Sequence, residues 1–176
     1  MAPEFTVEEL DTAYLRFQEV VADVARTKDW DLWADQFTVD AHYVEHAYGT
    51  FEGREAIRAW IAKTMTAFPG SHMVAYPALW HVCDAATGRV IAEVDNPMRD
   101  PGDGSVLTVT NISILTYAGD GLWSAAEDVY NPMEFGAMTY DWCQRAAACG
   151  TVDAPAQAWL DSYGRDFAPR RKPTQT

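Results

Sequence analysis

Two histidines, His42 and His46, lie in the segment AHYVEH, which separates two stretches of helical apolar spacing. A neutral imidazole can take up a proton near neutral pH, because its unperturbed pKa is about 6.5. The segment is short and rich in aromatic and β-branched residues, so we predict a strand with both rings on one face. Four residues along a strand span about 13 Å, so the two rings are not expected to bind one metal ion. A strand with titratable side chains between two apolar helices favours a pocket in this region over a plain apolar core.

Later segments supply an amide and a carboxylate. Asn111 lies inside an apolar run, where asparagine is unfavourable for a strand, and this indicates a role beyond local structure. Its amide could donate to a carbonyl oxygen that gains negative charge, or it could be satisfied by backbone groups or water. Glu127 and Asp128 are adjacent, and side chains alternate along a strand, so only one of them can face inward. We favour Asp128, with a surface carboxylate as the alternative.

Apolar periodicity and turn residues divide the chain into helices and strands. Helices are predicted over residues 6–27, 29–37, 54–68 and 132–149, with one more short helix around 159–167. Strands are predicted over residues 41–47, 72–84, 89–98, 105–117 and 122–131. Gly49 and Gly53 are expected to bracket a turn. The links between the last four strands are short and turn-like, so these strands should form an antiparallel meander.

The composition limits the classes of function. The chain has 176 residues, is 48% hydrophobic and carries a net charge of −13, so it can bury a substantial core but is repelled by phosphate backbones. We expect no nucleic-acid partner and, without a long apolar run, no membrane partner. Three cysteines without paired spacing predict a reducing compartment, and no secretory signal is recognisable, so a cytoplasmic protein is expected. No CxxC pattern is present and the two histidines lie on a strand, so no metal site is predicted.

The segment DAHYVEH, followed by GTFEGREAIRAW, resembles the signature of the SnoaL-like branch of the NTF2-like superfamily. The resemblance spans roughly residues 5–140. It implies an α+β cone in which N-terminal helices pack into a strongly curved antiparallel sheet around one deep pocket. We therefore expect a SnoaL-like domain over residues 1–150. Residues 151–176 would form a helical C-terminal extension, with the last ten residues disordered.

The same resemblance suggests catalytic roles. His46 falls where ketosteroid isomerase has its proton-shuttling aspartate, which would make it the general base. Asn111 falls near the oxyanion-holding position of that isomerase and resembles an asparagine of scytalone dehydratase, while His72 lies near an active-site histidine of the dehydratase. The alternatives are a histidine that is hydrogen-bonded in the core or at the pocket rim for His46, and a solvent-facing histidine at a strand edge, which we favour, for His72. A SnoaL-like cyclase uses an aspartate late in its sheet as acid or base, and Asp128 would take that role. In an enzyme of this kind, His46 and Asn111 should converge to within about 6–8 Å.

Together these expectations predict that the protein is a cofactor-independent lyase or isomerase that acts on a small apolar cyclic or aromatic substrate. The pocket is expected between the first helix, the 41–47 strand and the 105–117 strand, and five aromatic side chains should line it: Tyr14, Phe17, Tyr43, Trp60 and Trp80. The alternative is a non-catalytic small-molecule-binding or accessory protein, a class that the superfamily also contains. The strands carry apolar residues on both faces, so we expect a homodimer formed through the outer face of the sheet.

Overall fold

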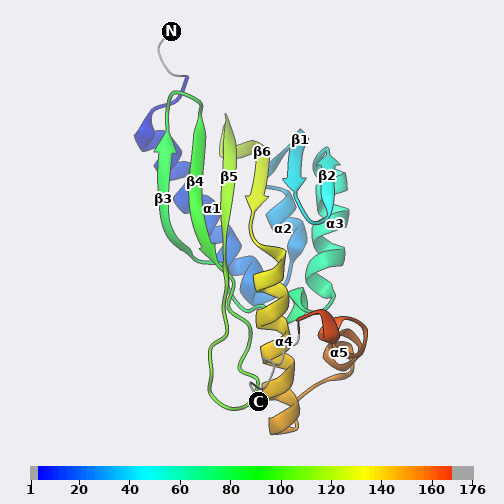
Figure 1. Cartoon of the computed structure of the whole chain (residues 1–176). Coiled ribbons are helices and arrows are strands. Elements are labelled where there is room, and N and C mark those ends of the chain that lie inside the picture. Colours follow the sequence, from blue (N-terminus) through cyan, green and yellow to red (C-terminus); the bar gives the residue numbers. More distant parts are fainter. Residues whose placement is uncertain (1–3, 168–176) are drawn as a thin grey trace, which may run out of the picture.

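The computed structural model describes residues 4–167 and contains helices packed against one open, mixed sheet. The helices are α1 (Val7–Thr27), α2 (Trp30–Ala34), α3 (Arg54–Thr66), α4 (Pro132–Cys149) and α5 (Ala154–Phe167), with a 3-10 turn, η1 (Gly70–His72). The strands are β1 (Phe37–Glu45), β2 (Gly49–Glu52), β3 (Ala78–Asp84), β4 (Arg89–Asp95), β5 (Thr110–Gly119) and β6 (Leu122–Val129). Figure 1 shows α1 crossing behind the sheet and α4 leading away from the end of β6. The predicted α+β cone is confirmed.

The strand order across the sheet is β2-β1-β6-β5-β4-β3. Strands β3 to β6 pair antiparallel with their sequence neighbours, which confirms the predicted meander. Strand β1 pairs with β6 in parallel, although α3 and the strands β2 to β5 lie between them in the sequence. A parallel pair needs a long crossover connection, and here α3 and the whole of the meander up to β5 provide it. This long-range pairing brings the AHYVEH segment next to Glu127 and Asp128.

Two details of the N-terminal half differ from the prediction. The predicted second helix includes Phe37, but α2 ends at Ala34 and Phe37 instead begins β1, where its side chain is fully buried. The predicted turn between Gly49 and Gly53 contains the short edge strand β2, which pairs antiparallel with β1. Helical and strand periodicities cannot be distinguished over so few residues, so the strand with which a segment pairs decides its secondary structure. Among residues 4–167, no helix combines the length and apolar character needed to cross a bilayer.

Side-chain alternation gives the sheet an inner face towards the helices and an outer face. Tyr43 and Glu45 of β1 are buried on the inner face, while His42 between them is exposed. The strand register aligns one inner row of core residues, namely Cys83, Val90, Leu115, Ala126, Tyr43 and Phe51. The inner row beside it is more polar and is called here the carboxylate row: His81, Ala92, Ser113, Asp128 and Glu45.

The C-terminal helices enclose a second apolar cluster beyond the end of the sheet. Asn131 accepts from the backbone N–H of Met133 and Pro132 follows it, so α4 begins where a capping residue and a first-turn proline predict. The buried members of this cluster are Met73, Met98, Met138, Trp142, Cys143, Ala146 and Ala156. Because Ala156 belongs to α5, the C-terminal extension folds back onto α4. Nearly all of the ten residues predicted to be disordered lie outside the described residues.

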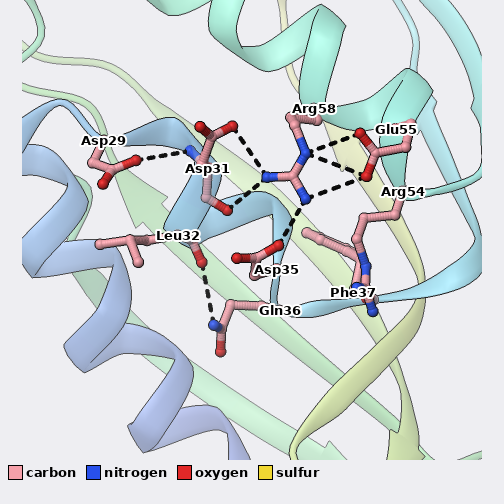
Figure 2. A network of polar contacts seen from close by, with 9 residues as sticks. All are labelled: Asp29, Asp31, Leu32, Asp35, Gln36, Phe37, Arg54, Glu55 and Arg58. Atoms are coloured by element: carbon pink, nitrogen blue, oxygen red, sulfur yellow. Dashed lines mark hydrogen bonds and ion pairs between the residues drawn. The ribbon is translucent and has the colours of Figure 1, made fainter.

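One arginine joins α2 to α3 (Figure 2). Arg58 of α3 donates to the carboxylate of Asp35 at 2.7 Å, to the carboxylate and backbone carbonyl of Asp31 at 3.1 Å, and to Glu55 of its own helix. These charge-assisted bonds raise the pKa of Arg58 above its usual range, with Asp35 as the largest cause. Nearby, Arg54 Nε donates to the backbone carbonyl of Phe37 at 2.6 Å, where β1 begins. The two arginines therefore fix α3 against the entry to β1.

We predict that Arg58→Met lowers the free energy of unfolding by about 1–2 kcal/mol, because it removes the charge-assisted hydrogen bonds of the guanidinium. The loss is not larger because the partner carboxylates are exposed to solvent. Methionine keeps the aliphatic stem, so the loss reports the guanidinium. Urea unfolding followed by tryptophan fluorescence measures the change, and added salt should shrink it. The control is Arg26→Met, which removes one exposed pair with Asp23 and should have no measurable effect. Equal losses in the two variants would contradict the prediction.

Candidate active site

The side chain of Asp128 is held at the inner face of β6 by donors from two neighbouring strands. Asn111 Nδ2 donates to its Oδ1 at 3.0 Å, and the Ser113 hydroxyl donates to the same oxygen. The Tyr43 hydroxyl donates to Oδ2 from the other side. Asp128 and Ser113 are register partners on β6 and β5, and Tyr43 lies on β1, which is parallel to β6. The sheet order thus places three donors around one half-buried carboxylate.

The donors are distributed unequally over the two carboxylate oxygens. A carboxylate offers about four lone-pair positions, two on each oxygen. Oδ1 accepts from Asn111 and Ser113, so its two positions are filled, whereas Oδ2 accepts only from Tyr43. Within residues 4–167, Oδ2 therefore keeps one position to which a ligand can donate a proton or a hydrogen bond. Of the two carboxylate oxygens, Oδ2 is therefore the one with room for a further donor.

The surroundings of Asp128 favour its protonated form. Burial raises the pKa of this carboxyl above its usual value, and the negative charge of Glu45 raises it further. The hydrogen bonds from Ser113, Tyr43 and Asn111 oppose this increase without cancelling it. A carboxylate whose pKa is shifted towards neutrality is a stronger base than one in water. Perturbation of this kind, in a position with a free lone pair, is typical of acid–base sites.

Asn111 belongs to the same network but cannot hold a substrate oxygen in this arrangement. One hydrogen of its amide is donated to Asp128 and the other to the Ser113 hydroxyl at 2.9 Å. Its carbonyl oxygen accepts from Nδ2 of the buried Asn96 at 2.9 Å. Both amide hydrogens are committed, so the residue orients the carboxylate and Ser113 rather than offering a free donor. The oxyanion role expected for Asn111 does not fit these contacts.

Two tyrosines and a glutamate complete the polar interior. Glu45 accepts from the backbone N–H groups of Ala47 and Tyr48 at 2.8 and 2.6 Å, so it holds the turn between β1 and β2. Burial and the Glu45 carboxylate raise the pKa of Tyr130 above its usual range. Burial and the charge of Asp128 do the same to the pKa of Tyr14, whose hydroxyl accepts from Gln18 at 3.2 Å. Both tyrosines therefore remain protonated and can act as neutral donors.

His46 lies on the wrong side of the sheet for the role of pocket base. Its Nε2 contacts Oε1 of Glu127 at 2.8 Å, and both side chains are about half exposed to solvent. Glu127 faces outward because it alternates with the inward Asp128. His46 therefore does not converge with Asn111 in a closed cavity. Tyr43 and Glu45 occupy the inner face of β1, one residue out of phase with His42 and Val44.

His72 is buried, but in the second apolar cluster and not in a strand. It ends η1, packs edge-on against Phe68 and Trp142, and its Nε2 lies 2.9 Å from Asp153 without hydrogen-bond geometry. Burial lowers the pKa of His72 below its usual value, and the charge of Arg99 adds to this effect. The residue is therefore neutral near physiological pH. It joins η1 to the start of the C-terminal extension, and it does not contact the Asp128 network.

Four of the five aromatic residues predicted to line the pocket lie in the interior. Tyr14 and Phe17 of α1 pack against Trp123, and Trp60 of α3 packs against Tyr43 with ring centroids 4.9 Å apart. The prediction is wrong for Trp80, which projects from the outer face of β3, where its Nε1 donates to Glu93 at 2.6 Å. Side chains alternate along β3, so His81 faces inward and Trp80 outward. The sequence alone does not show which of the two alternating sets of side chains faces the interior.

Two surface hollows in the part of the chain that the structure describes lie at opposite ends of α1. The larger, about 710 Å³, is bounded by the first turns of α1 and the β5–β6 turn around Asp120. The smaller, about 390 Å³, is bounded by Gln18, Arg26 and residues 74–77. The pocket predicted between α1, β1 and β5 is neither of these, because neither is lined by Asp128 or Tyr43. The smaller hollow approaches the interior through Gln18, which donates to Tyr14.

The polar network contains residues that the sequence did not single out. Ser113, Asn96 and Glu45 take part in it, and only the register across β1, β4, β5 and β6 brings them together. The available signal is the alternation of side chains along a strand, which puts Ser113 and Asn111 on one face of β5 and lets only one of Glu127 and Asp128 face inward. The sequence does not reveal which strands pair with one another, so it could not bring these residues together.

The sequence matches the family described as the SnoaL-like domain over residues 17–126, which is more than half of the chain. The chain belongs to the SnoaL-like family. A comparison with curated proteins finds no match. Several solved structures share the fold of this SnoaL-like protein at low sequence identity.

A hypothetical protein with a ketosteroid isomerase-like fold from Catenulispora acidiphila, crystallised with trimethylamine, is 22% identical with a TM-score of 0.55, over 76% of this chain and 93% of that one. TerC, co-crystallised with polyporic acid, is 16% identical with a TM-score of 0.56, over 72% of this chain and 97% of that one. An LEH-like epoxide hydrolase from M. tuberculosis is 10% identical with a TM-score of 0.59, over 81% of this chain and 96% of that one. At these identities, the likeness establishes the fold alone.

The raised pKa of Asp128 predicts how the stability of this SnoaL-like protein depends on pH. Because the folded-state pKa is the higher one, folding favours the protonated carboxyl. The contribution of Asp128 to the free energy of unfolding is greatest below the unfolded pKa of about 3.9 and falls as pH rises through the folded pKa.

The Asp128→Asn variant cannot titrate at this position, so it provides the reference. The free energy of unfolding of the wild type, minus that of the variant, should decrease with rising pH over this window. Urea unfolding at a series of pH values measures the difference. A difference that rises with pH would show that the hydrogen bonds outweigh burial and would contradict the assignment.

Proposed function

We propose that this SnoaL-like protein is a cofactor-independent acid–base enzyme of the lyase or isomerase kind, acting on a small apolar cyclic or aromatic substrate. The observation that carries the proposal is the half-buried Asp128 carboxylate, held by three donors and left with one free position on Oδ2. Such a group can remove a proton from a carbon next to a carbonyl and return it elsewhere. Cyclisation, elimination and isomerisation all use this step.

Each residue of the site has a distinct role in the proposed reaction. Asp128 Oδ2 takes the proton, while Asn111 and Ser113 keep the carboxylate oriented through Oδ1. Negative charge then develops on the substrate oxygen, which needs a nearby donor. Tyr14 suits this function, because its hydroxyl accepts from Gln18 and its own proton has no acceptor in residues 4–167. The carboxylate belongs to the sheet and the tyrosine to α1, and the two groups interact electrostatically, so in the proposed reaction the substrate binds between them.

Substrate entry requires a path from the surface to Asp128. The hollow of about 390 Å³ is our candidate for the entrance, because Gln18 separates it from the Tyr14 hydroxyl. Tyr76 also lines this hollow, and its buried hydroxyl has no hydrogen-bond partner among the described residues. A ligand group could satisfy that hydroxyl, since a buried polar atom without a partner is costly. Displacement of Gln18 would then open the path inward.

A second candidate function is non-catalytic binding of a small molecule. It is favoured by the fact that neither of the two prominent hollows is lined by Asp128. On this alternative, the three donors around Asp128 serve only to satisfy a carboxylate in the interior, and a ligand occupies the smaller hollow without reaching it. The two functions differ in whether Asp128 exchanges a proton with the ligand.

Proton exchange with solvent tests the enzyme proposal without knowledge of the product. A panel of small cyclic and aromatic ketones is incubated with the protein in heavy water, and deuterium incorporation is followed by NMR. Asp128→Asn should reduce the exchange rate by roughly 10²–10⁴-fold, because it removes a positioned base. His46→Gln is the matched control and should retain the wild-type rate, because His46 lies on the outer face.

Two results would overturn the role of Asp128. The first is loss of exchange in His46→Gln with retention in Asp128→Asn. The second is an absence of exchange throughout the panel, combined with equal binding of an aromatic probe to the wild type and Asp128→Asn. Polyporic acid, the molecule crystallised with TerC, serves as that probe, and tryptophan quenching reports its binding. The second result would favour the binding function.

We also propose that two copies associate through the outer face of the sheet. This face carries an apolar set aligned by the register: Trp80, Val82, Ile91, Ile112, Ile114 and Val129. The exposed fractions of Trp80, Val82 and Val129 are 45%, 54% and 44%. Large apolar side chains gathered on one face of a sheet mark an interaction surface, and a second copy presents the same surface in a symmetric pair.

Charge placed on this face should separate the copies. We predict that the wild type sediments as a dimer, that Val82→Asp sediments as a monomer with unchanged circular dichroism, and that Val106→Asp remains a dimer. Val106 is the control because it is 74% exposed but lies outside the strands, between β4 and β5. Sedimentation velocity at micromolar concentration distinguishes the states. A monomeric wild type would contradict the proposal.

A further inference from the structure

Three potential metal ligands meet between α1 and the edge strand β3. Asp11 lies on the second turn of α1, while His81 and Cys83 are two residues apart on β3 and share its inner face. One ligand atom from each residue lies within 4.8 Å of the other two. His81 Nε2 and Asp11 Oδ1 are 2.7 Å apart. All three residues are half-buried, so an ion from solvent can reach them.

We propose that Asp11, His81 and Cys83 form a binding site for a divalent transition metal ion, with Zn²⁺ as the expected occupant. A thiolate, an imidazole and a carboxylate are the ligand types that Zn²⁺ takes in proteins, and three of them leave one tetrahedral position for water. The mixture of sulfur, nitrogen and a single carboxylate disfavours Mg²⁺ and Ca²⁺, which prefer oxygen ligands. The site is separate from Asp128, which lies three strands away in the sheet order, and it does not depend on the proposed function.

The distances require only small side-chain movements. With bonds of about 2.0–2.3 Å, tetrahedral ligand atoms lie roughly 3.3–3.8 Å apart. The His81–Asp11 contact would therefore open by less than about 1 Å, and the Cys83 sulfur would move inward by a similar amount. The Tyr14 ring packs against the His81 ring with centroids 4.7 Å apart and restricts its orientation. The backbone of β3 is fixed by its antiparallel pairing with β4.

The thiol gives up a proton when the ion binds. Burial and the charge of Asp11 raise the pKa of Cys83 above its usual value, so the free protein holds this residue as a thiol. Coordination replaces the thiol proton, which passes to solvent, and the imidazole binds through a nitrogen that carries no hydrogen.

Occupation of the site would fasten the sheet edge to the first helix. Among the described residues, strand β3 has one strand neighbour, β4, and Asp11 supplies a contact to its inner face from α1. A metal bound to the folded state stabilises that state in proportion to its occupancy. The expected role is therefore a clamp between α1 and β3.

Cobalt titration of the full chain tests the site directly, since Co²⁺ takes the same geometry and a cobalt–thiolate bond gives a near-ultraviolet charge-transfer band. We expect one Co²⁺ per chain, displaced by Zn²⁺, with the band lost in Cys83→Ser and retained in Cys149→Ser. Cys149 is the control because it is an exposed free thiol on α4. His81→Asn and Asp11→Asn should each weaken binding by at least tenfold, since even outer-sphere partners contribute roughly 10–100-fold.

Thermal unfolding provides the second measurement. Zn²⁺ should raise the melting temperature of the wild type and of Cys149→Ser, but not that of Cys83→Ser. Without metal, Cys83→Ser should melt within a few degrees of the wild type, which shows that the variant folds. A charge-transfer band that survives in Cys83→Ser would overturn the proposal. So would its loss in Cys149→Ser, or the absence of any saturable Co²⁺ binding to the wild type.

Discussion

The structure depends on keeping an ionisable carboxyl at the inner face of an apolar sheet. Asp128 can stay there only if hydrogen bonds replace the water that burial removes. The donors come from β5 and from β1, the two strands that flank β6. The parallel β1–β6 pairing is therefore more than a way to extend the sheet, because it carries Tyr43 to Oδ2. The strand order and the polar site are two aspects of one arrangement.

The register also separates polar from apolar surroundings. The carboxylate row lies next to an inner row of core residues, so its polar groups face apolar side chains from the helices. Such surroundings strengthen every electrostatic interaction at Asp128 and make an unpaired group costly. The carboxylate row also contains His81 at its β3 end, where the interior meets the sheet edge and α1. One row of the sheet thus contains Asp128 of the proposed acid–base centre and His81 of the proposed metal site.

Local patterns were sufficient for the helices and for the meander, because periodicity, capping residues and turn residues act over a few positions. Alternation predicts that only one of Glu127 and Asp128 faces inward, and the structure shows that it is Asp128. The role expected for His46 comes from aligning it with the aspartate of ketosteroid isomerase, but the structure places His46 beside the outward Glu127. A shift of one residue on a strand is enough to move a side chain to the opposite face. The β1–β6 pairing and the Asp11–His81 contact join residues about 70 or more apart in the sequence. No local signal encodes such contacts, so the site could not be assembled from the sequence.

The unequal distribution of donors around Asp128 links stability to chemistry. Three bonds are enough to hold the carboxylate, and a fourth on Oδ2 would stabilise the ion further and lower its pKa. Leaving that position open keeps the pKa raised and preserves a place for a proton. Asn111 contributes because both of its amide hydrogens are used within the network, which fixes Oδ1 and, among residues 4–167, leaves free capacity on Oδ2. The same bonds that make Asp128 tolerable in the interior therefore determine which of its oxygens can accept a further hydrogen bond.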